Sequence, residues 1–64
     1  MTVNGESYPY RDGLTLHGLL DELHVDRRTV AVMRGDDIYR GERAPDVPLA
    51  DPDIVEIVTM MQGG

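Results

Sequence analysis

The most regular pattern in the sequence is an apolar stripe at helical spacing in the first half of the chain. Four leucines fall at positions i, i+3, i+4 and i+7, which places them on one face of a helix. They are Leu16, Leu19, Leu20 and Leu23. Thr15 directly precedes the stripe and is a favourable N-cap residue, and residues 25–28 are expected to end the helix. The pattern therefore predicts one amphipathic helix.

The first ten residues predict a hairpin. Asn4-Gly5 is the dipeptide favoured in two-residue type I′ turns, and Thr2-Val3 and Glu6-Ser7 flank it as short strands. We expect the second strand to continue through Tyr8-Pro9-Tyr10. Pro9 cannot donate a hydrogen bond to a neighbouring strand, so this strand should lie at a sheet edge or bend there.

Three further strands are predicted after the helix. Apolar and β-branched residues favour a strand over Thr29–Met33 and a shorter one over Ile38–Arg40. Residues 41–48 are expected to form a loop, with Leu49 as its anchor in the core, and the last strand is Ile54–Met60. The element order is β-β-α-β-β-β, which indicates an α+β protein whose one helix covers one face of a small sheet.

The last strand is apolar on both of its faces. Alternation places Val55, Ile57 and Thr59 on one face. The other face carries Ile54, Glu56, Val58 and Met60. Both faces would be buried in a fully covered central strand. Because one helix covers only one face and few residues remain to cover the other, we expect the second set to be exposed and to dock another protein.

Length and charge limit the classes of function. Sixty-four residues allow one small domain, and twelve acidic residues against six basic ones give a net charge of −6. That balance argues against nucleic acid as a partner and favours a protein with a basic docking surface. The chain has no cysteine, so it cannot carry sulfur or an acyl group on a thiol of its own. No membrane span or targeting segment is recognisable, so we expect a cytoplasmic protein with no membrane partner.

Few residues suggest a metal or catalytic site. His17, Asp21 and His24 lie on the polar side of the predicted helix and are possible metal ligands. Exposed histidines on such a face are ordinary, and the aspartates of the second half lack the spacing of a calcium loop. The sequence contains no glycine-rich phosphate loop and no evident nucleophile–base pair. We therefore expect no metal, no cofactor and no catalytic site of the protein's own.

The end of the sequence is the remaining candidate for chemistry. The last strand leads through Met61 and Gln62 to Gly63-Gly64. Glycine has no Cβ, so such a tail can enter a channel too narrow for side chains, and its ionised carboxylate can attack an activated phosphate. We expect a flexible tail over residues 61–64, with Met61, Gln62 and Gly63 threading and Gly64 reacting. The alternative is an ordinary frayed terminus.

Several motifs, taken together in their order, resemble a known family. They are Thr-Leu-x-x-Leu-Leu at 15–20, Val-Ala-Val at 30–32, Arg40 after a short strand, and an apolar strand that runs into Gly-Gly. The chain resembles the ThiS sulfur carriers of thiamine biosynthesis, small relatives of MoaD and ubiquitin. The resemblance implies a ubiquitin-like β-grasp fold, a mixed small sheet with one helix packed on one face, and a single sulfur-carrier domain over residues 1–64.

The resemblance also implies a chemical cycle and three partners. An ATP-dependent, ubiquitin-activating-type adenylyltransferase, similar to ThiF, would convert the Gly64 carboxylate to an acyl adenylate. A sulfur donor such as a cysteine desulfurase would then displace AMP and leave a thiocarboxylate. A thiazole synthase, similar to ThiG, would take the sulfur. The protein itself would be a co-substrate, and a monomer when alone.

The chain departs from the family pattern at three places, and other functions fit parts of it. Arg34-Gly35 stands where Asn-Gly is usual, Asp51-Pro52-Asp53 where Gly-Asp is usual, and Gln62 where a small apolar residue is commoner. A MoaD-like small subunit of molybdopterin synthase is the first alternative. A tRNA-thiolation carrier, a protein modifier, and a β-grasp interaction module with an inert tail are the others.

Overall fold

The predicted order of elements is confirmed in a computed structural model of the chain, which describes residues 1–60. The strands are β1 (Thr2–Val3), β2 (Glu6–Ser7), β3 (Val30–Arg34), β4 (Asp37–Arg40) and β5 (Ile54–Thr59). The helix is α1 (Leu16–Glu22), and two short 3-10 helices are η1 (Arg27–Thr29) and η2 (Gly41–Arg43). No helix within residues 1–60 is long and apolar enough to cross a membrane.

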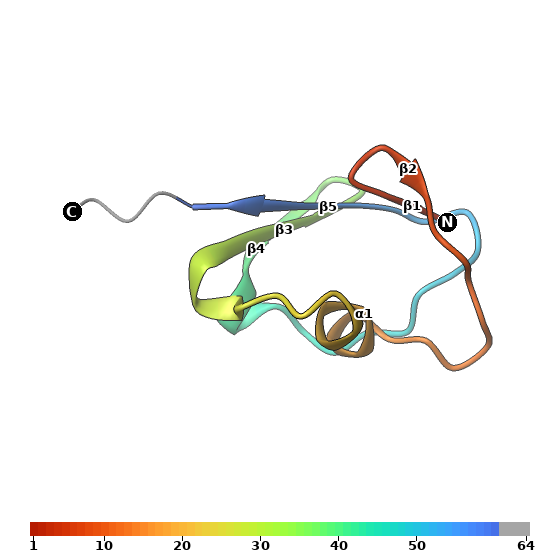
Figure 1. Cartoon of the computed structure of the whole chain (residues 1–64), viewed down its shortest axis with the longest axis horizontal. Coiled ribbons are helices and arrows are strands. Elements are labelled where there is room, and N and C mark those ends of the chain that lie inside the picture. Colours follow the sequence, from red (N-terminus) through yellow and green to blue (C-terminus); the bar gives the residue numbers. More distant parts are fainter. Residues whose placement is uncertain (61–64) are drawn as a thin grey trace.

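The five strands form one mixed sheet in the order β2-β1-β5-β3-β4 (Figure 1). β5 is its central strand, parallel to β1 and antiparallel to β3. The remaining two pairs, β1–β2 and β3–β4, are antiparallel. α1 lies on one side of the sheet, and the described chain places no element over the other side (Figure 1). The sheet therefore has one covered and one open face.

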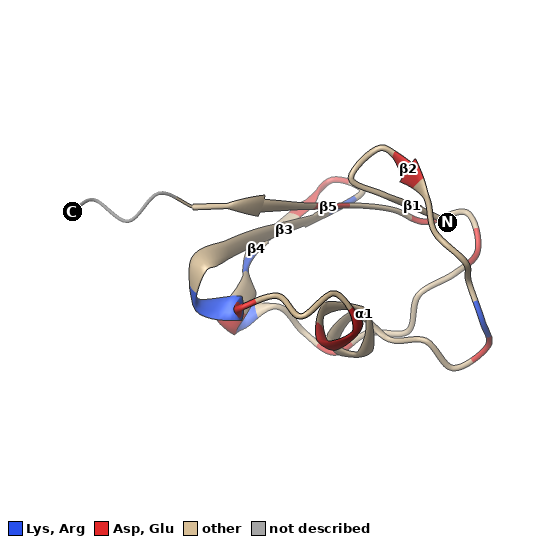
Figure 2. Ribbon diagram, in the orientation of Figure 1, with Lys and Arg blue, Asp and Glu red and all other residues tan. Residues whose placement is uncertain are grey.

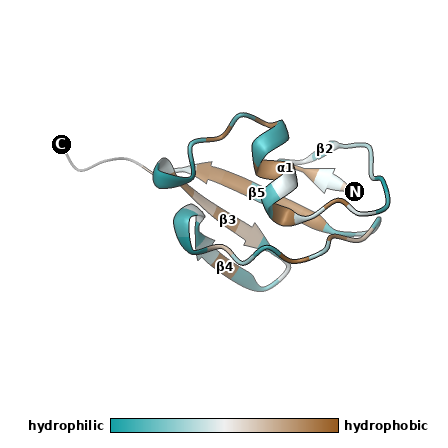
Figure 3. Cartoon of the chain, turned by 90° about the horizontal axis from the view of Figure 1, so that it is seen from below, coloured by the Kyte–Doolittle hydropathy of each residue, from teal (hydrophilic) through white to brown (hydrophobic). Residues whose placement is uncertain are grey.

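The core lies between α1 and the covered face of the sheet. The first three leucines of the stripe are fully buried, and Leu23 packs at the margin. The sheet contributes Val3, Val30, Val32 and Val55, and the connecting segments contribute Leu14, Ala44 and Leu49. Figure 3 shows hydrophobic residues along β5, with α1 crossing in front of it. Leu49 is the core anchor that the sequence predicts.

The helix begins as predicted and ends earlier. Thr15 is the N-cap, and its hydroxyl accepts a hydrogen bond from the Gly18 N–H at 3.2 Å. Residues 25–28 are predicted to end the helix, but α1 already ends at Glu22, with Leu23 as its C-cap. His24 has a φ of +56°, and the N–H of Val25 bonds back to the carbonyl of Leu20. These contacts form a Schellman-type end, in which histidine holds the left-handed position that glycine usually takes.

The N-terminal hairpin is confirmed at its turn and corrected in its length. Asn4 and Gly5 have φ values of +53° and +82°, as a type I′ turn requires. β2 lies at the sheet edge, as Pro9 suggests, but the predicted strand over Tyr8-Pro9-Tyr10 is wrong. Pro9 has no N–H to donate, so the ladder stops near Ser7 and the chain turns toward the helix.

The segment after β4 is more ordered than a loop. It begins with η2 and then runs along the start of α1, where the N–H of Leu16 donates to the carbonyl of Val47. The Thr15 hydroxyl and the His17 backbone N–H donate hydrogen bonds to the Asp46 carboxylate and hold the pKa of Asp46 below its ordinary value. These contacts fix the segment to the helix and leave the open face of the sheet uncovered.

Replacing Gly41 with alanine is expected to destabilise the fold strongly. Gly41 is buried where η2 packs on η1, and an added Cβ would press on the carbonyl oxygen of Arg27 and lie 2.8 Å from Val30 Cγ2. Backbone cannot move away as cheaply as a side chain end, so we expect a loss of about 2–3 kcal/mol in the free energy of unfolding, measured by urea denaturation. Glu42→Ala, at the exposed neighbouring residue, should change it by less than about 0.5 kcal/mol. Equal stability of the two variants would contradict this packing.

Candidate docking face and C-terminal strand

The backbone of β5 pairs with strands on both sides at its start and with β3 alone toward its end. Ile54 and Val55 pair with Thr2 and Val3 of β1, and residues 55–59 pair with β3. Beyond the strand, the N–H of Met60 donates to the carbonyl of Thr29 at 2.7 Å. These bonds hold the C-terminal part of β5 in the sheet up to Met60.

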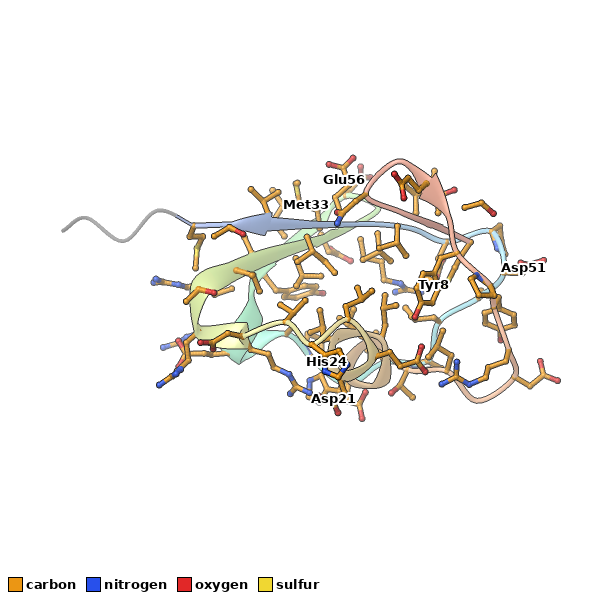
Figure 4. All side chains as sticks on the ribbon, viewed as in Figure 1. Tyr8, Asp21, His24, Met33, Asp51 and Glu56 are labelled. Atoms are coloured by element: carbon orange, nitrogen blue, oxygen red, sulfur yellow. The ribbon has the colours of Figure 1, made fainter. Side chains whose placement is uncertain are left out.

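The two faces of β5 differ as the alternation predicts. Val55 is fully buried, and Ile57 packs against the core. On the opposite face, Ile54 is 59% exposed and Val58 is 46% exposed. Figure 4 shows the Glu56 side chain on the side of the sheet away from α1. The expected exposure is confirmed for Ile54, Glu56 and Val58. The docking role of this face stays a prediction.

The end of β5 fits the simple alternation less well. Thr59 belongs by period to the covered face, yet it is exposed. Figure 1 shows the end of β5 projecting past α1, so the helix does not cover this position. Met60 is half-buried and lies one residue beyond the strand. Met60 remains part of the predicted docking site because its backbone N–H still bonds to Thr29 beside the sheet.

The open face is wider than the last strand predicts. Directly paired residues share a face, so the pairing of β3 with β4 and β5 adds one row with Met33 and Ile38 and another with Ala31 and Arg40. Ile38 is 70% exposed. The sequence-based prediction of the docking face used only the last strand and so did not include these four residues. The same period of two, applied to residues 30–33, would have placed Ala31 and Met33 opposite the buried valines.

Asn4 makes a further contact to β5 that the turn motif does not reveal. Its backbone N–H donates to the carbonyl of Val55 at 3.0 Å, and its side-chain Oδ1 accepts the Ile57 N–H at 2.7 Å. The side chain thus continues the pairing of β5 after β1 has ended. The contact links residues 53 positions apart, so local sequence cannot predict it.

Asn4→Gly is expected to lower the free energy of unfolding by about 1 kcal/mol. Glycine keeps the positive φ of the turn, so the change removes only the Oδ1 acceptor of the Ile57 N–H. Urea denaturation would measure the loss, and hydrogen exchange should show faster exchange of the Ile57 amide. Unchanged protection of that amide would mean that the side-chain bond contributes nothing.

The possible metal ligands do not assemble into a site. Figure 4 shows Asp21 and His24 near one end of α1, and His24 lies beyond the helix in the left-handed conformation. Asp21 pairs with Arg27 at 3.0 Å, and the His17 ring contacts the carbonyl of Ala44 at 2.6 Å. No cluster of three potential metal ligands occurs among residues 1–60.

The predicted reactive tail lies outside the described residues. Met61, Gln62, Gly63 and Gly64 are the residues concerned. Their roles in threading and in reaction therefore stay predictions. The described residues provide the strand that leads to them and the open face beside it.

A mixed five-stranded sheet with one helix on one face, in this strand order, defines a small α+β protein of the ubiquitin-like β-grasp class. The model of the ThiS family matches the chain over residues 1–64. The chain belongs to the ThiS family of sulfur carrier proteins.

Individual relatives agree with this assignment. The chain is 44% identical to the sulfur carrier protein ThiS of Thermus thermophilus over 62 residues, which cover 97% of this chain and 95% of that protein. It is 32% identical to the sulfur carrier protein ThiS of Bacillus subtilis, covering all of this chain and 98% of that one. A thiazole synthase of Paramagnetospirillum magneticum is 38% identical over 64 residues, the whole of this chain but only 20% of the synthase.

Proposed function

We propose that this chain carries sulfur as a thiocarboxylate on Gly64 and delivers it for the thiazole part of thiamine. The main support for the proposal is the match to the ThiS family model, which covers the chain to residue 64 and so includes Gly63 and Gly64. In this proposal the single domain of residues 1–64 is a co-substrate of other enzymes. It contributes a carboxylate and a docking surface, and its partners contribute the catalysis.

The first step is activation of the carboxylate. The α-carboxylate of Gly64, with a reference pKa of about 3.5, is ionised at neutral pH. One of its oxygens attacks the α-phosphorus of ATP, and the bond from that phosphorus to the pyrophosphate oxygen breaks. The products are an acyl adenylate and pyrophosphate. An adenylyltransferase of the ubiquitin-activating type, similar to ThiF, would hold both reactants.

The second step exchanges oxygen for sulfur. Hydrosulfide attacks the carbonyl carbon of the adenylate. A donor such as a cysteine desulfurase would supply it from a persulfide, whose outer sulfur is released when a thiol attacks the inner sulfur and forms a disulfide. The carbon–oxygen bond to AMP breaks, and the thiocarboxylate, AMP and a proton are released. The chain has no cysteine and so no thiol of its own. The resemblance to the ThiS carriers implies that the Gly64 carboxyl group is its acyl handle.

In this proposal, the open face of the sheet is the docking surface for the adenylyltransferase. Ile54 and Val58 expose apolar area there without any element of residues 1–60 over them. Passing Met61, Gln62 and Gly63 through a channel orders those residues at a cost of about 1–2 kcal/mol each. Burial of the open face in the complex would offset that cost. Glu56 is the polar residue of this proposed docking surface, and Met60 lies at its end nearest the tail.

The thiazole synthase relative supports thiamine as the pathway. That protein is named thiazole synthase, the enzyme that accepts the sulfur in this proposal. One segment of its polypeptide is similar to the whole of this chain. A carrier joined to its acceptor would meet it at high effective concentration. This observation favours a ThiG-like acceptor over the molybdopterin alternative.

The pathway can be tested with the thiocarboxylate form of the chain. We would supply it separately to thiazole synthase and to the large subunit of molybdopterin synthase, each with its other substrates, and follow loss of sulfur by intact mass. Loss of sulfur to thiazole synthase is expected. A thiocarboxylate that is consumed only by the molybdopterin enzyme would refute the thiamine assignment.

A further inference from the structure

The open face of the sheet ends in a groove at the end remote from the C-terminal tail. The groove, of about 520 Å³, lies between the β3–β4 turn at residues 34–37 and the approach to β5 at residues 52–54. A second hollow of about 280 Å³ extends it toward Met33 and Glu56. The two share Gly35, Asp36 and Ile54, so they form one continuous depression leading onto the open face.

The groove is acidic, and its one basic residue is already paired. Arg34 donates from Nε and Nη2 to Asp53 Oδ2 at 3.2 and 3.0 Å, and both side chains are half-buried. The side chains of Asp36, Asp37 and Glu56 have no hydrogen bond or ion pair to any residue in the described range 1–60. Figure 2 shows the acidic β3–β4 turn beside β5. Within the described range, three carboxylates therefore have no paired basic group.

The wall between these carboxylates is apolar. Ile54 lines both parts of the groove and is 59% exposed, and Met33 lines the inner part. Long basic side chains bury their methylene stems on apolar surface while the charged head reaches polar groups. A groove with an isoleucine wall and carboxylates around it therefore matches an arginine or lysine side chain in both shape and charge.

We propose that this groove receives a basic side chain of the protein that docks on the open face. The inference rests on the proposed function, because it identifies the chemistry by which the adenylyltransferase recognises this carrier. The groove adds a second attachment point to the reactive tail. Along β5, Ile54 and Val58 are separated by about 13 Å of strand, so the partner's basic residue would sit about that far behind the end of the sheet from which the tail departs.

The opposite end of the open face carries the opposite charge. Arg40 pairs across the sheet with Ala31, which in turn pairs with Val58 near the end of β5. The face is thus polarised along β5, from the acidic groove at Ile54 to Arg40 beside Val58. A partner docked in reverse would place its basic side chain against Arg40, which is unfavourable. The polarity therefore selects the orientation that directs the tail toward the active site of the partner.

Neutralising the groove tests this proposal. The triple variant Asp36→Asn, Asp37→Asn and Glu56→Gln keeps the side-chain shapes and removes the three charges. The matched control, Glu6→Gln, Asp12→Asn and Glu42→Gln, removes the same charge from exposed sites outside the groove. The probe is the ThiF-like adenylyltransferase of the same organism, and pyrophosphate release gives KM and kcat for the carrier at low and high ionic strength.

We expect the groove variant to raise KM about tenfold at low salt with kcat unchanged, and to lose most of the salt dependence of KM. The control should stay within about twofold of wild type. Equal KM values for the two triple variants would overturn the proposal. Wild type that releases no pyrophosphate at all would instead refute the proposed function, so the two failures are distinguishable.

Discussion

Shortening or lengthening the tail by one residue is expected to abolish activation of the carrier while its fold stays intact. Deleting Gly64 withdraws the terminal carboxylate by about 3.5 Å, and adding one glycine after Gly64 moves it forward by the same distance. In the proposed mechanism the carboxylate would meet the α-phosphorus of ATP at bonding distance, and a misplacement of about 1 Å can already cost about 100-fold in rate. Neither change touches the core between α1 and the sheet.

Both tail variants would be compared with wild type in ATP-dependent pyrophosphate release at saturating carrier concentration. We expect a loss of at least about 100-fold in kcat for each. Gln62→Ala is the matched control, because it changes a tail side chain and preserves length, and it should retain most of the activity. An extended protein that is activated as fast as wild type would show that Gly64 is not the reacting residue.

Placing a charge on the open face is expected to have the second largest effect. Val58 is 46% exposed on that face, so Val58→Asp leaves the core unchanged in the free protein. In the complex, the same carboxylate would be desolvated without a designed partner. We expect KM for the carrier to rise about 30-fold or more, the usual scale for a central interface residue, with kcat nearly unchanged.

Thr59→Asp is the control for this experiment. It introduces the same charge one residue further along β5, where the side chain points to the face opposite Val58. Circular dichroism and urea denaturation would establish that both variants fold. A normal KM for folded Val58→Asp would eliminate the open face as the docking surface. An equal rise for both variants would assign the effect to charge near the tail.

The parts of the fold that could be predicted are those set by local pattern. The leucine stripe predicts α1, Thr15 caps it, and Asn4-Gly5 makes the turn of the hairpin. The alternation in β5 separates the buried Val55 from the exposed Val58, because a small chain with one helix can cover only one side of its sheet.

The parts that could not be predicted depend on tertiary contacts or on unusual residues. His24 ends α1 in a conformation that normally signals glycine, so no local signal marks the helix end there. The close packing of Gly41 on the backbone of Arg27 joins two 3-10 helices across a strand pair. The groove exists only because the Arg34 turn and the Asp53 approach meet at one end of the sheet.

The candidate site divides in the same way. The outward residues of β5 follow from period two, whereas Ile38 and Arg40 join the face through pairing of β4 with β3. The departure from the family pattern at Arg34 becomes intelligible in three dimensions, since that residue pairs with Asp53 and leaves the other carboxylates of the groove without a partner among residues 1–60. The chemistry assigned to Gly64 depends on the family resemblance and not on geometry.

The most direct test of the proposed carrier chemistry is the intact mass of the wild-type chain after incubation with the adenylyltransferase, ATP and hydrosulfide. Arg43 is the last basic residue and the chain has no lysine, so trypsin releases residues 44–64 as one peptide in which the modified residue can be located. We predict a mass gain equal to sulfur replacing oxygen, located at Gly64 and absent when ATP is omitted. An unchanged mass, although pyrophosphate release shows that the adenylyltransferase is active on the chain, would contradict the thiocarboxylate mechanism.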